Sequence, residues 1–292
     1  MKRVALVIVL VVIAGLAGIV RSHSRVHASI ADLPGVFCNN SGQARDEIRK
    51  SYELATGARV ELTDINGAIN IETSDTGTAD VYIERTAASP EALNRRKISI
   101  EANSNSLRIY GEKVCVGFFA RLFGSNPTEQ VTLRLPRQIS LLAKGVNGSL
   151  TSGELEGSVE VHGVNGRVQI SGAAGTVDFK GINGNILVGL NRLSSDGVSI
   201  HGVNGNIELQ LSEGLNADVD AHGMNGRLTS DLPEVTIDKS RRGSYTARIG
   251  SGGSAISAHG INGNIRLTRA VGTSPDTAEA ANSKEQSANS KQ

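Results

Sequence analysis

Residues 159–170 read VEVHGVNGRVQI, two short runs of alternating apolar and polar residues on either side of a Gly-Val-Asn-Gly step. Alternation with a period of two is typical of β-strands that bury one face. The step Gly-(apolar)-Asn-Gly, called the tetrad below, recurs along the second half of the chain. The tetrad asparagines are Asn147, Asn165, Asn183, Asn204, Asn225 and Asn262. They are 18, 18, 21, 21 and 37 residues apart, and a period of about 20 residues is typical of solenoids and other repeat arrays.

The last of these spacings is close to two periods. We therefore expect one further turn whose tetrad has decayed, near Arg242 and Gly243. Asn66, in the related step Asp64-Ile65-Asn66-Gly67, precedes the array and is expected to lie outside it.

Asn-Gly between alternating runs is also a strong signal for a β-hairpin. A hairpin centred on Asn165 would pair Val161 with Ile170, but it would place the apolar second residue of each tetrad, such as Val164, on the polar face. In a solenoid the tetrad is a corner, its apolar residue points into the core, and stacked asparagines exchange side-chain hydrogen bonds. We therefore predict an all-β chain that forms a single-stranded β-solenoid with Gly-x-Asn-Gly corners, and a hairpin meander is the alternative.

The alternating runs also predict which side chains form the core of two neighbouring coils. These are Val159, Val161, Val164, Val168 and Ile170 in one coil, and Val177, Phe179, Ile182, Ile186 and Val188 in the next.

The segment before the repeats is also predicted to be rich in strands, and Ser89 followed by Pro90 predicts a short helix. Strand-like runs lie at 59–62, 68–71, 81–83, 97–100 and 107–110. We expect a linker or cap at 29–58, an N-terminal β-rich part at 59–135, solenoid repeats at 136–270 and a disordered tail at 271–292, which has few apolar residues. The ends of a solenoid need capping, and we expect the N-terminal part to cover one end and residues 266–273 the other.

The chain opens with Lys2 and Arg3, followed by apolar or small residues at 4–20. Basic residues before an apolar run are typical of an export signal, and the run is also close to the length that spans a bilayer. Residues 1–28 are therefore interpreted as a signal peptide cleaved after Ala28 or as a membrane anchor. Either interpretation predicts an exported protein in the periplasm or at the cell surface, held by one transmembrane helix if the leader is retained.

Cys38 and Cys115 are the two cysteines of the chain. In an oxidising compartment two cysteines favour one disulfide, and two buried, unpaired thiols are the alternative. The apolar insert at 114–123 is interpreted either as a cap over an open end of the β-structure or as a loop that faces a partner or a membrane.

Composition excludes several classes of function. The net charge is +1 and no run of Lys and Arg forms a stripe, so nucleic acid is not expected as a partner. Aromatic residues make up 3% of the chain and Trp is absent, which argues against surfaces that stack bases or sugars. The sequence has no nucleophile elbow, zinc-protease motif or phosphate loop, so we predict no enzyme activity, no catalytic residue and no cofactor.

The residue before each tetrad is lysine or histidine: Lys144, His162, Lys180, His201, His222 and His259. Stacked in register, these side chains form one outward column, in which His201 and His222 are expected to be neighbours within reach of a shared metal ion or anion. The alternative is a solvated column without a ligand. A metal site needs three or more ligands with ordered partners, so no metal is predicted, and His201 and His222 are the candidate ligands.

Several segments of the chain recur together in one known family. They are the run at 59–71, the run VTLRLP at 131–136, the serial Asn-Gly strands, and the stretch ARIGSGG at 247–253 that leads into the last tetrad. Over residues 50–270 this combination resembles the bacterial putative-adhesin domain family of unknown function. The resemblance implies a β-solenoid related to the head domains of autotransporter adhesins, in an exported or anchored protein without enzyme activity or family catalytic residues. Lysine or histidine before the tetrad departs from that family, where Asp or Thr is common.

Two functions follow from these features. One is a non-catalytic binding or scaffold module of the cell envelope, whose partner is an envelope protein or a glycan. The other is a self-associating structural or stress-related envelope protein that pairs through its ends. A polysaccharide-active β-helix enzyme is less favoured, because Asp178, Asp218 and Asp220 are scattered singly along the repeats.

Overall fold

The computed structural model describes residues 37–38, 44–113 and 126–270. Contacts divide the chain into residues 1–35 and 36–292, and every described residue belongs to the second unit. The leader, Cys115 with its expected disulfide, the apolar insert and the tail after residue 270 lie outside the described residues. In the described ranges no helix has the length and apolar character needed to cross a membrane.

The described chain is all-β and forms two large mixed sheets, which do not close on themselves. In spatial order, sheet A comprises β1 (Phe37–Cys38), β2 (Ala44–Glu53), β5 (Thr78–Ala87), β8 (Thr128–Pro136), β4 (Ile69–Ser74), β10 (Leu150–Leu155), β12 (Val168–Ala173), β14 (Ile186–Leu190), β16 (Ile207–Leu211), β22 (Ile265–Arg269) and β18 (Leu228–Ser230). Sheet B comprises β19 (Val235–Arg241), β20 (Ser244–Ile249), β17 (Ala217–His222), β21 (Ser254–Asn262), β15 (Val198–Asn204), β13 (Val177–Lys180), β11 (Val159–His162), β9 (Ser140–Lys144), β3 (Arg59–Thr63), β7 (Ser106–Lys113) and β6 (Arg96–Asn103).

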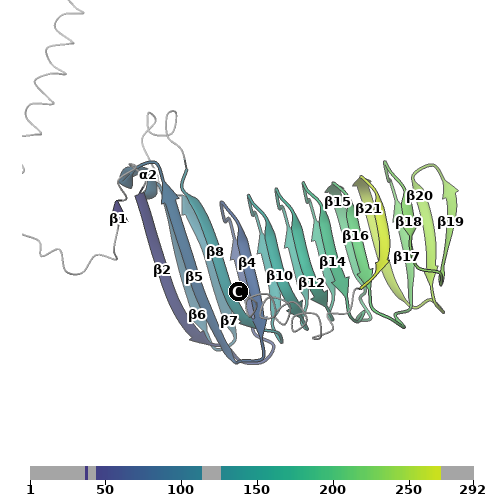
Figure 1. The fold of residues 1–292 in the computed structure, drawn as a ribbon, viewed down its shortest axis with the longest axis horizontal. Coiled ribbons are helices and arrows are strands. Elements are labelled where there is room, and N and C mark those ends of the chain that lie inside the picture. Colours follow the sequence, from purple (N-terminus) through teal and green to yellow (C-terminus); the bar gives the residue numbers. More distant parts are fainter. Residues whose placement is uncertain (1–36, 39–43, 114–125, 271–292) are drawn as a thin grey trace, which may run out of the picture. The chain divides into compact units, whose positions relative to one another are not determined.

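Strands that follow each other in the repeat region alternate between the two sheets (Figure 1). β9, β11, β13 and β15 are parallel neighbours in sheet B, and β10, β12, β14 and β16 are parallel neighbours in sheet A. The hairpin pairing of Val161 with Ile170 does not occur, because Val161 opposes Ala143 and Phe179 on the neighbouring strands of its own sheet.

The core lies between the two sheets and consists of the residues that the alternation predicts. All ten side chains named for the two coils are at most 1% exposed. The second residue of the tetrad is buried as well: Val146, Val164, Ile182, Val203 and Ile261 are each 1% exposed, and Met224 is 7% exposed. Burial of these apolar side chains is the main favourable contribution to the fold.

The two glycines of the tetrad are required for different reasons. Gly163 has φ of 64°, in the left-handed region that L-residues with a side chain adopt at a cost. Gly166 lies against the preceding coil, where an added Cβ would overlap the carbonyl oxygen of Gly148. The first glycine is therefore required by its backbone conformation, and the second by close approach of two backbones in addition to its positive φ of 159°.

At the C-terminal end the strands leave chain order. β21 lies between β15 and β17 (Figure 1). In the other sheet, β22 lies between β16 and β18. The prediction of a decayed turn near Arg242 and Gly243 is wrong, because these residues form the turn of the antiparallel hairpin β19–β20. The prediction that residues 266–273 cap this end is also wrong for its described part, since Arg266 lies in β22 with a strand on either side.

The N-terminal end shows the same departure from chain order. β3 lies between β7 and β9, and β4 lies between β8 and β10. Asn66 lies between β3 and β4 and so belongs to the array, contrary to the prediction from sequence. Antiparallel strands β5 and β2 continue sheet A, and β6 continues sheet B. The predicted short helix is confirmed as α2 (Pro90–Leu93), with Ser89 as its N-cap.

Candidate functional site

The tetrad asparagines form one hydrogen-bonded ladder along the outside of the β-structure. Each Nδ2 donates to the Oδ1 of the next asparagine at 2.8–3.1 Å. From donor to acceptor the order is Asn225, Asn262, Asn204, Asn183, Asn165, Asn147 and Asn66. The ladder ends where Nδ2 of Asn66 donates to the carbonyl oxygen of Pro127 at 2.7 Å. The amides therefore all point toward the N-terminal end of the stack.

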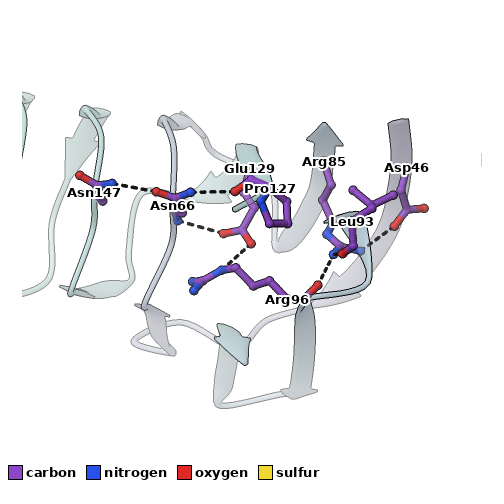
Figure 2. A network of polar contacts seen from close by, with 8 residues as sticks. All are labelled: Asp46, Asn66, Arg85, Leu93, Arg96, Pro127, Glu129 and Asn147. Carbon is purple, nitrogen blue, oxygen red and sulfur yellow. Dashed lines mark hydrogen bonds and ion pairs between the residues drawn. The ribbon is translucent and has the colours of Figure 1, made fainter. Parts of the chain in front are cut away.

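A buried ion pair closes that end of the ladder (Figure 2). Glu129 is fully buried, and its Oε1 accepts a hydrogen bond from Nε of Arg96 at 2.7 Å. Its Oε2 accepts from the backbone N–H of Asn66 at 2.9 Å. The charge of Glu129 thus has a cationic partner and a backbone donor, which is what a buried carboxylate requires.

Arg85 continues this network on the other side of Arg96 (Figure 2). Its guanidinium donates to Asp46 at 2.9 Å, to the carbonyl oxygen of Leu93 at 2.8 Å and to that of Arg96. These contacts join β5 to β2, to α2 and to β6. The charged groups of the network pair with one another or with backbone carbonyls, and only the buried Nε of Arg85 has no partner among the described residues. We therefore assign the network a structural role.

The lysine and histidine column lies on the outer face of sheet B, next to the tetrads. His201, His259 and His222 occupy equivalent positions on β15, β21 and β17. The ring centroids of His201 and His259 are 5.9 Å apart, and those of His259 and His222 are 5.8 Å apart. His201 and His222 are therefore not neighbours, as the sequence suggested, because the out-of-order strand β21 places His259 between them.

The other half of the column is organised around Asp178. One of its oxygens, Oδ2, accepts from Nζ of Lys180 at 2.5 Å and lies 3.3 Å from Nε2 of His162. Burial by itself would raise the pKa of Asp178, but the hydrogen bonds from Lys180 and His162 together outweigh it and leave the pKa below its ordinary value. Asp178 is thus held as a carboxylate between two side chains of the column.

His222 contacts polar side chains of its own strand and of the neighbouring strand β20. Nε2 of His222 lies 2.7 Å from Asp220, and its Nδ1 lies 3.2 Å from Oγ of Ser244. Among the residues that the structure describes, no group of three or more His, Cys, Asp or Glu side chains is placed to hold a metal ion. The column presents imidazole and ammonium groups on the outer face of sheet B.

A second column was missed at the sequence level. The residues directly after the tetrads stack in the order Ser149, Arg167, Asn185, Asn206, Asn264 and Arg227, as the backbone hydrogen bonds between coils show. Oδ1 of Asn185 accepts from the backbone N–H of Asn206 at 2.9 Å, and Oδ1 of Asn206 accepts from that of Asn264 at 3.0 Å. An alignment of the tetrads would reveal these residues, but their order depends on the position of β22.

Comparisons with known proteins give the following result. No family model and no curated protein matches the chain. A putative cell adhesion protein of Clostridium sporogenes aligns with 77% of this chain and 99% of its own, at 14% identity and a TM-score of 0.39. A putative adhesin of Bacteroides fragilis aligns with 76% of this chain and 97% of its own, at 11% identity and a TM-score of 0.31. A lipid binding protein of Parabacteroides distasonis, also putative, covers 76% and 94% at 10% identity and a TM-score of 0.20. At these low scores the function is argued from the residues of this chain.

Proposed function

We propose that this chain is an exported, adhesin-like and non-catalytic binding or scaffold module of the bacterial cell envelope. In this proposal the repeats form a single-stranded β-solenoid, the tetrads are its corners, and residues 1–28 direct or anchor the protein. The partner is an envelope protein or a glycan that contacts the outer face of sheet B.

The observation that carries the proposal is the register between coils. Equivalent residues of successive strands oppose one another in both sheets, for example His162 with Lys144 and Lys180. Neighbouring strands are about 4.8 Å apart, so side chains at equivalent positions, here lysines and histidines, are repeated at short intervals along a regular surface. Such a surface suits repeated weak contacts with a partner, because linked contacts gain affinity through high effective concentration.

The column of sheet B is the part of this surface with the most distinctive chemistry. His201 and His259 are exposed and His222 is half-buried, so all three reach the outer face. His162 and Lys180 share the partly buried carboxylate of Asp178, whereas the rings of the three histidines lie directly beside one another. The rings of His201 and His259 are available to donate or accept hydrogen bonds with a partner, whereas both ring nitrogens of His222 already contact Asp220 and Ser244.

The test is capture of a partner from envelope extract of the source cells. The wild-type chain is compared with a variant that carries His201→Asn, His259→Asn and His222→Asn, and with a control that carries Thr151→Asn and Ser171→Asn on sheet A. We expect wild type and control to retain the same partner and the histidine variant to lose it. Equal retention by all three proteins would refute a role for the column, and no retained partner at all would count against a binding module.

Self-association through the ends is the second function considered, and the strand edges argue against it. Edge strands avoid pairing with other chains by being short or charged. β1, at one edge of sheet A, has two residues and pairs with only Ala44 and Arg45 of β2. The rest of β2 carries Asp46, Glu47, Arg49 and Lys50, and β18 at the other edge of sheet A has three residues. Light scattering should therefore show a monomer at all concentrations, whereas filaments that grow with concentration would favour self-association.

A further inference from the structure

A hollow of about 830 Å³ lies on the outer face of sheet A, over β12, β14, β16, β22 and β18. Its lining includes three arginines, Arg167, Arg227 and Arg266, and one acidic residue, Glu208. The charge of these four side chains is therefore +2, in a chain whose net charge is +1. This hollow is called the sheet A groove below.

Arg167 and Arg227 lie on either side of the three asparagines Asn185, Asn206 and Asn264 in the column of residues that follow the tetrads. Arg167 precedes Asn185 in the stack and Arg227 follows Asn264. Four strand spacings separate them, which puts their backbones about 19 Å apart. Neither guanidinium belongs to an ion pair among the described residues, whereas Arg266 pairs with Asp231. A ligand that meets both free guanidinium groups must be extended and must carry negative charge along its length.

We propose that the sheet A groove binds an acidic polysaccharide, a linear chain of sugars with carboxylate groups, laid along the stack of coils. Arg167 and Arg227 pair with carboxylates at the two ends of the bound segment, since guanidinium matches the planar carboxylate with two donors. Between them the amides of Asn185 and Asn206, which line the groove, meet sugar hydroxyls through Nδ2, because their Oδ1 atoms are engaged by backbone N–H groups.

An acidic peptide has the same charge but fits the groove less well. An extended peptide gains most of its affinity from main-chain hydrogen bonds to a free strand edge. The groove lies on the face of the sheet, where the backbone groups of β14 and β16 are already paired on both sides. A sugar chain needs no strand edge, because its hydroxyl groups pair with side-chain amides.

The proposal is separate from the column of sheet B, so each can fail without the other. Binding of full-length protein to polygalacturonate is measured by titration calorimetry at low salt, with dextran as the neutral polysaccharide and polyglutamate as the acidic peptide. We expect binding to polygalacturonate, weakening as salt is added, and no binding to dextran. A double variant, Arg167→Gln with Arg227→Gln, should lose about tenfold or more in affinity. Arg192→Gln with Arg242→Gln, at two exposed arginines outside both the groove and the column, is the matched control and should bind like wild type.

A second variant tests the groove without removing an arginine. Asn206→Asp keeps the acceptor for the Asn264 N–H and adds a negative charge to the groove lining, so affinity for polygalacturonate should fall while the thermal midpoint changes little. Unchanged affinity in both the double variant and Asn206→Asp would overturn the assignment of the groove. Polyglutamate that binds wild type as tightly as polygalacturonate would overturn the choice of a polysaccharide, and absence of binding to polygalacturonate would overturn the proposal as a whole.

Discussion

The central coils and the two ends of the β-structure obtain their order in different ways. From β9 to β16 each coil stacks on the one before it in the chain, and the contacts are apolar side chains, close backbones and asparagine amides. At either end a strand pair lies out of chain order, β21 and β22 at one end and β3 and β4 at the other, and the strands beyond it include antiparallel ones. The N-terminal end adds buried charge, in Glu129 and Arg96. The centre is thus specified by repetition, and the ends by contacts that occur once.

The largest test of this contrast is removal of the buried charge at the N-terminal end. Glu129→Ala leaves Arg96 without its ionic partner and the backbone N–H of Asn66 without its acceptor. We therefore expect a loss of about 3–5 kcal/mol in the free energy of unfolding. Urea unfolding followed by circular dichroism measures it. Glu61→Ala, in an exposed pair with Arg108, is the control and should cost less than about 1 kcal/mol. Similar losses in both variants would remove the distinction between buried and exposed charge.

The second test compares two glycines of one central tetrad. Gly166→Ala should cost more than Gly163→Ala, because only the former places a Cβ against a neighbouring backbone. We expect about 1–2 kcal/mol for Gly163→Ala, from its left-handed conformation, and more than about 3 kcal/mol for Gly166→Ala, from displacement of a coil. Thermal unfolding of both variants gives the order. The reverse order would show that backbone conformation, and not close approach, fixes the tetrad.

The third test compares the centre of the asparagine ladder with its C-terminal end. Asn183 makes two ladder hydrogen bonds, whereas Asn225 makes one. Asn183→Ala should therefore cost about 1 kcal/mol and Asn225→Ala about half of that, since exposed hydrogen bonds contribute little net free energy. Denaturant midpoints of the two variants measure the difference. An equal loss at both positions would mean that the cost does not follow the number of ladder hydrogen bonds removed.

The smallest expected effect lies at Asp178, in the centre of sheet B. A carboxyl whose pKa is lowered on folding stabilises the folded state above its unfolded pKa, and that contribution is lost as the pH falls through the lowered value. The pKa of Asp178 is lowered from 3.8, so Asp178→Asn should be less stable than wild type at neutral pH by under about 1 kcal/mol. The difference in stability between the two proteins should vanish once the pH falls below the lowered pKa of Asp178 in the folded state. Unfolding across a pH series measures it, with exposed Glu156→Gln as a control without effect.

Much of the fold was predictable because each coil obeys local rules. Alternation identified the buried side chains, and the apolar second residue of the tetrad correctly rejected the hairpin. Asn66 was missed because Asp64 stands where the tetrad has glycine. Asp64 has φ of 53°, and aspartate is one of the few residues with a side chain that adopts this conformation.

The order of the last coils could not be read from their side chains. Val203, Ile261 and Met224 are all buried apolar side chains, and the three histidines occupy equivalent positions on the outer face. Any order of these coils satisfies the same columns, so the hairpin β19–β20 and its connections decide it. The position of His259, and with it the sheet A groove, therefore depends on pairing between distant segments.

The insertion of β21 and β22 has a consequence for the route by which the chain reaches its native state. β17 and β18 meet neither β15 nor β16. Their parallel partners in the described chain, β21 and β22, therefore arrive only with residues 254–269. Contacts between distant segments slow folding, because a loop must close before any contact repays its entropy. During synthesis the strands β9 to β16 can pair as they emerge, while residues 217–230 pair only after the segment that follows them has been made. The last native contacts to form would then lie inside the stack, and not at its tip.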